Sequence, residues 1–136
     1  MTQPTQKTSI RLPLKHQVTG IFIPVADVAR ARAWYQSVLG LSPGEILFGH
    51  LCCIELDGGP TLLLDQQLTP EGASAAQRGG YPLFMFATDD IHASLERLRA
   101  AGVEIVEYGG QAVQNGHWFN FKDCEGNLLM ACGPSA

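Results

Sequence analysis

The chain has 136 residues, of which 46% are hydrophobic and 16% are charged. These values predict one globular domain that buries roughly two thirds of its unfolded surface, and they exclude a disordered chain. The formal net charge is −4 and Lys and Arg are not clustered, so nucleic acid is not an expected partner. No apolar run is long enough to cross a bilayer, so no membrane association is expected.

The first half of the chain alternates between strand and helix signals. Residues 1–16 are polar without apolar periodicity, which predicts a flexible N-terminal tail. The predicted elements that follow are a strand at 18–25, a helix at 28–39, and three strands at 45–48, 50–56 and 60–65. Asp27 is the predicted N-cap of the helix, and Gly40 ends it. Residues 67–80, rich in Gly, Ala, Gln and Pro, form a predicted linker.

The second half repeats this order. The predicted elements are a strand at 81–87, a helix at 91–101, and three strands at 104–108, 116–122 and 127–132. Asp90 is the predicted N-cap of this helix, and Gly102 ends it. A turn at 123–127 joins the last two strands.

The two halves also share marker residues. Asp27 corresponds to Asp90, and His50 corresponds to His117. A period of roughly 65 residues is too long for a solenoid, so it indicates two equivalent modules around one core. The predicted fold class is α+β, with two βαβββ modules that form paired mixed sheets. The predicted single domain spans 17–136, with module one at 17–66, the linker at 67–80 and module two at 81–133.

The number and spacing of the cysteines predict the cellular compartment of the protein. The four cysteines form no CxxC pair, and the N-terminus lacks the apolar segment of a secretion signal. Reduced thiols and a cytoplasmic location are therefore expected.

Three stretches resemble the vicinal oxygen chelate superfamily, the group of glyoxalase I, bleomycin resistance proteins, fosfomycin resistance proteins and extradiol dioxygenases. They are 23–41, 86–103 and 121–127, and the last is close to the family's F-x-D-P-[DE]-G-N turn, with Cys124 in place of proline. The resemblance implies the glyoxalase/bleomycin resistance-like fold, with modules that curl into cups around a cleft. It also implies a homodimer in which each cleft uses both subunits. Whether modules pair within one chain or between chains stays open.

The resemblance further locates the positions where family enzymes hold a divalent metal with His, Gln or Glu. The first-strand positions are Gly20 and Leu83, and the last-strand positions are Leu63 and Met130. None of these residues binds a hard or borderline divalent ion. Glycine and leucine have no side-chain donor atom, and the thioether of Met130 suits only soft metals. We therefore expect no metal and no cofactor there. The four positions instead predict an apolar cleft floor that binds a small molecule by burial.

Two histidines are candidates for the rim of this cleft. His50 and His117 both stand at the start of the third strand of their module. They are either a symmetry-related pair that reaches the cleft or two polar strand ends near solvent.

Alternation along 117–122 supplies two further rim candidates. Trp118 and Asn120 share one face of this strand, and Phe119 and Phe121 share the other. Which face lines the cleft stays open.

Three classes of function remain. The favoured one is a metal-independent protein that binds an amphipathic or aromatic small molecule in the cleft between modules. The alternative is a glyoxalase- or dioxygenase-type enzyme, a lyase or oxidoreductase, with a divalent metal at displaced ligands such as His50, Glu55 or His117. The third is a dimeric scaffold without a ligand. The sequence leaves open whether any reaction is catalysed.

Overall fold

The structure, a computed structural model, describes residues 12–68 and 80–135. The first module contains β1 (Gly20–Pro24), α1 (Val28–Ser37), β2 (Pro43–Leu47), β3 (Leu51–Glu55), β4 (Thr61–Asp65) and the short 3-10 helix η2 (Gln66–Leu68). The second module contains β5 (Met85–Ala87), α2 (Ile91–Ala100), β6 (Ile105–Val106), β7 (Trp118–Lys122) and β8 (Leu128–Cys132). The predicted fold class, two βαβββ modules, is confirmed. No helix in these ranges is long and apolar enough to cross a membrane.

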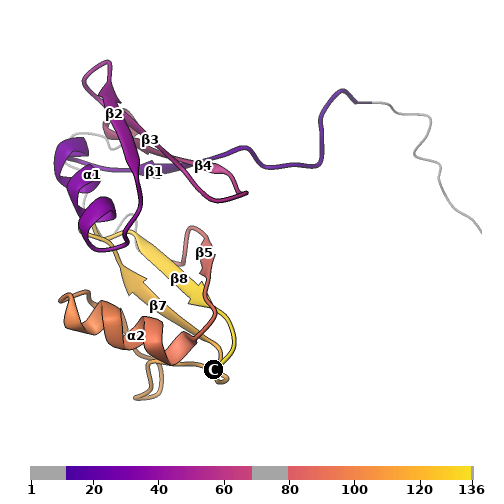
Figure 1. Cartoon of the computed structure of the whole chain (residues 1–136), viewed down its shortest axis with the longest axis vertical. Helices are drawn as coiled ribbons and strands as arrows, with labels where there is room; N and C mark the ends of the chain where they lie inside the picture. The colour runs from indigo at the N-terminus through magenta and orange to yellow at the C-terminus, as the bar shows by residue number, and fades with distance from the viewer. Residues whose placement is uncertain (1–11, 69–79, 136) are drawn as a thin grey trace, which may run out of the picture.

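Each module forms one four-stranded mixed sheet (Figure 1). The strand order is β1-β4-β3-β2 in the first sheet, here sheet A, and β5-β8-β7-β6 in the second, here sheet B. β1 runs parallel to β4, β5 runs parallel to β8, and the other neighbours are antiparallel. The same order in both sheets is the three-dimensional form of the sequence repeat.

Both helices begin where the sequence predicts, and they end two residues (α1) and one residue (α2) earlier than predicted. The Asp27 side chain accepts a hydrogen bond from the backbone N–H of the residue three positions on, at 3.0 Å, and Asp90 does the same at 3.2 Å. Gly40 and Gly102 follow the helices with φ of 71° and 81°. Glycine reaches this left-handed conformation without a side-chain clash, so the chain can turn back toward its sheet.

One face of each sheet packs against its own helix, and the two packed layers merge into one core. The buried strand residues of this core are Ile23, Cys52, Ile54, Leu62, Leu64, Phe119, Phe121, Leu129 and Ala131. The helices contribute Val28, Ala31, Tyr35, Ile91, Leu95 and Leu98. No α-helix of residues 12–68 or 80–135 covers the opposite face of each sheet, and we call it the helix-free face.

The second module docks on α1 through the turn between β7 and β8. The Glu125 carboxylate accepts hydrogen bonds from the backbone N–H groups of Ala26 at 2.8 Å and Asp27 at 3.1 Å. Arg30 also donates to Glu125, at 3.1 Å. The N-terminus of α1 is therefore capped by an anion from the other module. This end of a helix favours negative charge, because its backbone N–H groups carry partial positive charge.

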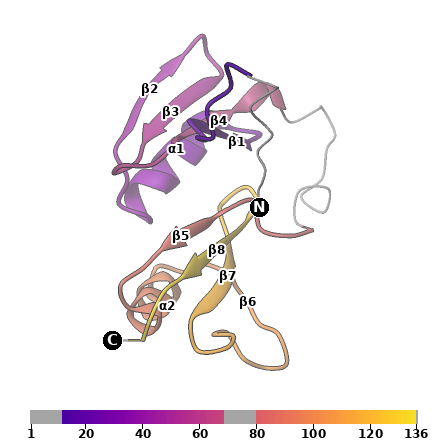
Figure 2. The same ribbon diagram turned by 90° about the vertical axis from the view of Figure 1, so that its right-hand side faces the viewer.

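This docking places α1 between sheet A and the second module, as Figure 2 shows. Because α1 covers one face of sheet A, the helix-free face of sheet A is turned away from the second module. The predicted linker, apart from 67–68 and 80, and most of the predicted tail lie outside the described residues.

Most strands are shorter than predicted, and β5 and β6 lose the largest share of their predicted length. β5 begins at Met85 instead of residue 81, because the preceding segment contains Pro82, which has no backbone N–H for a ladder. β6 covers only Ile105–Val106, because the chain turns away at Gly109 and Gly110, which have φ of 61° and 78°.

Candidate functional site

On sheet A, two of the predicted floor positions lie side by side on the helix-free face. A side-chain carbon added to Gly20 would lie 3.0 Å from Cδ1 of Leu63, so Leu63 fills the space beside the glycine. Leu63 pairs with Phe22 on one side and Cys53 on the other. Phe22 is 57% exposed. The result is an apolar row across the helix-free face of sheet A.

On the second module, Met130 lies in β8, and Leu83 lies just before β5, the neighbouring strand. Met130 pairs with Met85 and with Asn120, and Leu83 donates its backbone N–H to Leu128 at 2.9 Å. Met85 is 62% exposed, and Leu83 is also exposed. These residues make the matching row of sheet B, because Met85, Met130 and Asn120 correspond in the repeat to the row of sheet A.

The four predicted floor positions therefore form two pairs, one on each sheet. Gly20 in β1 and Leu63 in β4 belong to the helix-free face of sheet A, and Figure 2 shows sheet A with α1 between it and the second module. Leu83 and Met130 belong to that second module. A single chain does not bring the two pairs onto one floor.

His50 is held by a carboxylate. Its Nδ1 lies 3.0 Å from Oδ1 of Asp65, and the same oxygen accepts a hydrogen bond from the backbone N–H of Gln67 at 3.0 Å. Asp65 is buried and His50 is half-buried. Asp65 thus fixes the imidazole orientation and leaves its Nε2 as the group that a ligand can meet.

His117 differs from its counterpart in the repeat. It is exposed, and its side chain has no hydrogen-bond partner among residues 12–68 and 80–135. The position that corresponds to Asp65 is Cys132, which cannot anchor an imidazole as a carboxylate does. The two histidines occupy equivalent strand ends but different environments.

Trp118 and Asn120 lie on the helix-free face of sheet B, since Phe119 and Phe121 fill the core. Nδ2 of Asn120 donates to the Tyr108 hydroxyl at 2.9 Å, and the Tyr108 and Trp118 ring centroids are 6.1 Å apart. Asn120 is only 3% exposed. An aromatic corner with a buried amide therefore flanks Met130.

Sequence reasoning missed Phe22, Met85 and Tyr108 as parts of these faces. Strand alternation is a signal for two of them, because Phe22 shares the phase of Gly20 and Met85 shares the phase of Leu83. Tyr108 has no such signal, because it stands beyond the end of β6.

Within one chain, the described donor atoms on these faces do not converge as metal ligands. In the described part of the chain, no three His, Cys, Asp or Glu side chains come together. His50 and Glu55, two of the proposed displaced ligands, stand at opposite ends of β3, and His117 is on the other module. Of these residues, His50 pairs with Asp65 in the described chain, which gives two donors where protein metal sites use three or four.

Two of the four thiols, Cys52 and Cys124, are poorly suited to nucleophilic chemistry. Burial raises the pKa of the Cys124 thiol to about 11, and the adjacent Asp123 carboxylate adds to the rise. Burial also raises the pKa of the Cys52 thiol. Because the thiolate is the nucleophile, a raised pKa keeps both groups protonated and unreactive at neutral pH.

Known structures share this architecture. UcmS2 has a TM-score of 0.69 and 24% identity, with 88% of this chain and 98% of that chain covered. TnmS3, described as an antibiotic binding protein from Streptomyces sp. CB03234, has a TM-score of 0.66 and 24% identity, with 92% and 100% covered. A lactoylglutathione lyase from Agrobacterium tumefaciens has a TM-score of 0.66 and 21% identity, with 88% and 94% covered. At these identities the likeness shows the fold.

Sequence comparison gives a family but no curated relative. No curated protein matches the chain. Residues 15–131 match the model of the Glyoxalase/Bleomycin resistance protein/Dioxygenase superfamily. The match covers most of the chain and both modules, so the chain belongs to this superfamily.

Proposed function

We propose that this protein binds an amphipathic or aromatic small molecule without a metal, in a cleft that two chains build together. The observation that carries the proposal is the chemistry of the four positions Gly20, Leu63, Leu83 and Met130. They hold no metal ligand, and they continue into the large apolar side chains that both helix-free faces expose.

The dimer follows from the orientation of these faces. Phe22 on sheet A and Met85 on sheet B are more than half exposed, yet they belong to faces that one chain cannot bring together. Apolar patches of this kind on a soluble protein mark an interaction surface. A homodimer with the helix-free face of sheet A against the partner's sheet B would cover both and enclose a cleft.

Polar groups at the margins of the faces would orient the ligand. His50, held by Asp65, would offer Nε2 from sheet A. Trp118 would stack on an aromatic portion of the ligand from sheet B, and Asn120 would present its amide beside it. Apolar area with a few placed polar groups is the usual composition of a small-molecule site.

Two further observations support this function. TnmS3, whose fold matches, is described as an antibiotic binding protein. All four cysteines, which lie within the described ranges, are free thiols, and this fits the proposed cytoplasmic location.

One pair of residues, His50 and Asp65, favours the enzyme alternative. The bond between His50 and Asp65 resembles the arrangement that orients a general base. The metal-dependent version is less well supported, because His50, Glu55 and His117 do not converge.

The test combines metal analysis with ligand screening. Protein purified without chelator should carry well under one equivalent of transition metal, and its melting temperature should not change with chelator. Aromatic and antibiotic compounds should raise the melting temperature, because a ligand bound only by the folded state stabilises it. Sedimentation should give the mass of a dimer. A stoichiometric metal that is lost together with activity would replace this proposal with the enzyme alternative.

A further inference from the structure

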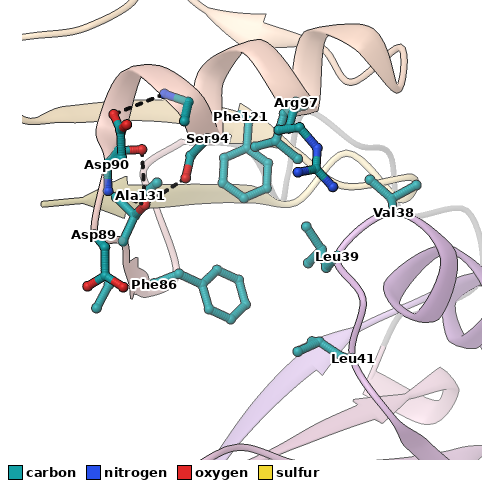
Figure 3. A pocket seen from close by; sticks show the side chains of 14 residues that line it. Val38, Leu39, Leu41, Phe86, Asp89, Asp90, Ser94, Arg97, Phe121 and Ala131 are labelled. Carbon is teal, nitrogen blue, oxygen red and sulfur yellow. Dashed lines mark hydrogen bonds between the residues drawn. The ribbon is translucent and has the colours of Figure 1, made fainter. Parts of the chain in front are cut away.

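A second pocket lies on the opposite side of sheet B from the proposed cleft. Its volume is about 500 Å³, and it lies between α2, the core face of sheet B and the chain just after α1 (Figure 3). This volume falls within the range of small-molecule sites, roughly 300–1,000 Å³. The lining residues used below are Leu39, Phe86, Asp89, Ala93, Arg97, Phe121 and Ala131.

The pocket exists because the two modules differ at equivalent positions. In the first module, Tyr35 and Leu64 are fully buried between α1 and sheet A. The repeat places Leu98 at the position of Tyr35 and Ala131 at the position of Leu64. Both substitutions remove side-chain volume under α2, and the missing volume opens the space.

The floor of the pocket is aromatic and apolar. Figure 3 shows the rings of Phe86 and Phe121 pointing into the space from sheet B, with Leu39 facing them from the end of α1. Phe121 is buried and Phe86 is half-buried. A flat aromatic body would bury its area against these rings, which favour offset or edge contacts.

Among the described residues that line the pocket, Arg97 is the cation, and it stands at one end. Arg97 extends from α2 toward Val38 and Leu39 (Figure 3). Its side chain has no hydrogen bond or ion pair with another residue of 12–68 or 80–135, whereas Arg99 on the same helix pairs with Glu107 at 3.2 Å. A guanidinium offers paired N–H donors that match the two oxygens of a carboxylate.

The other end limits the ligand charge. Asp89 is exposed at the end opposite Arg97 (Figure 3). A carboxylate there disfavours a second anionic group on the ligand. We propose that this pocket binds an aromatic monocarboxylate, with its ring on Phe86 and Phe121 and its carboxylate on Arg97.

The experiment is calorimetric titration of the full chain with naphthoate and with its neutral analogue naphthamide. Arg97→Gln should weaken naphthoate binding about tenfold or more, as expected for the loss of a charge-assisted hydrogen bond, and should leave naphthamide unchanged. Arg99→Gln is the matched control, because it removes the same charge from the same helix, roughly 200° around its axis. It should leave both affinities unchanged.

A second variant tests the pocket itself. Ala131→Leu restores the leucine of the first module and should abolish binding of both probes, with its fold checked by circular dichroism. If that variant does not fold, Ala93→Leu at the exposed wall fills the same space. The proposal is overturned if wild-type protein does not bind naphthoate at millimolar concentration, or if Arg97→Gln leaves naphthoate binding intact. It is also overturned if Trp118→Ala abolishes that binding, because the ligand would then occupy the proposed cleft.

Discussion

The Tyr35 hydroxyl donates a 2.6 Å hydrogen bond to Oδ2 of Asp123, and this buried bond joins the first helix to the last turn of the second module. Asp123 also accepts the backbone N–H groups of Glu125 and Asn127 through its other oxygen. One carboxylate therefore organises the turn and attaches it to α1.

Tyr35→Phe should destabilise the protein by about 1–3 kcal/mol, because it leaves a buried carboxylate oxygen short of a donor. Urea unfolding monitored by fluorescence measures the change. Tyr81→Phe, at an exposed tyrosine, is the control and should change the free energy of unfolding by less than about 0.5 kcal/mol. Equal effects of the two substitutions would show that the Tyr35 bond contributes no stability.

Gly133→Ala should be among the most damaging single-methyl changes in the chain. A side-chain carbon at Gly133 would overlap the backbone carbonyl of Thr88, and backbone cannot move aside as a flexible side chain does. The expected loss is roughly 2–4 kcal/mol, at or above the usual range for overpacking. Gly59→Ala makes only ordinary contacts and is the matched control. A melting temperature for Gly133→Ala equal to that of Gly59→Ala would contradict this geometry.

Stability should fall as the pH rises above about 9. The pKa of Cys124 is raised from 9.0 to about 11 in the folded chain, mainly by burial. Between these values the unfolded chain has lost a proton that the folded chain retains, so unfolding is favoured as pH rises. Burial and the Asp123 carboxylate also raise the pKa of Tyr35 well above 10, which extends the loss to higher pH.

Thermal melts from about pH 8 to pH 11 test this sign. Cys124→Ala should flatten part of the decline in its lower range, because one of the two thiols with a raised pKa is removed and Cys52 remains. Cys53→Ala is the control substitution. A wild-type melting temperature that rises through this range would refute the prediction.

Met130→Glu combined with Leu83→His tests the apolar floor. The pair introduces two metal ligands of the family type, one in β8 and one just before β5, and places polar groups in the proposed dry site. It should weaken apolar ligands and destabilise the protein by roughly 1–3 kcal/mol. Added Zn²⁺ should recover part of the lost stability, because a metal that binds only the folded protein stabilises it. Unchanged ligand affinity in the metal-free double variant would remove Met130 and Leu83 from the site.

The sequence was sufficient for the architecture because its signals are local. Asp27 and Asp90 cap helices through side-chain bonds to residues three positions away, and the glycines that follow end the helices. These short-range rules act in the same way in both modules, so the repeat and the order of elements were predictable.

The arrangement of the site was less predictable, because long-range contacts decide it. Strand alternation placed Trp118 and Asn120 on one face but could not say which face was buried. Tyr108 joins Asn120 across a loop with no periodic pattern. The separation of the floor positions into two pairs depends on where the second module docks, and no local pattern reports that contact.

The cap that Glu125 places on α1 also has a consequence for biosynthesis. It accepts from the backbone at Asp27 across 98 residues of chain, so the first helix, already capped by the Asp27 side chain, gains this second terminal anion only after residue 125 has left the ribosome. Chains with many such distant contacts fold slowly, because a long loop must close first. At roughly 5–20 residues per second, the first module waits several seconds for this partner. During that interval its exposed apolar face, including Phe22, is open to chaperones.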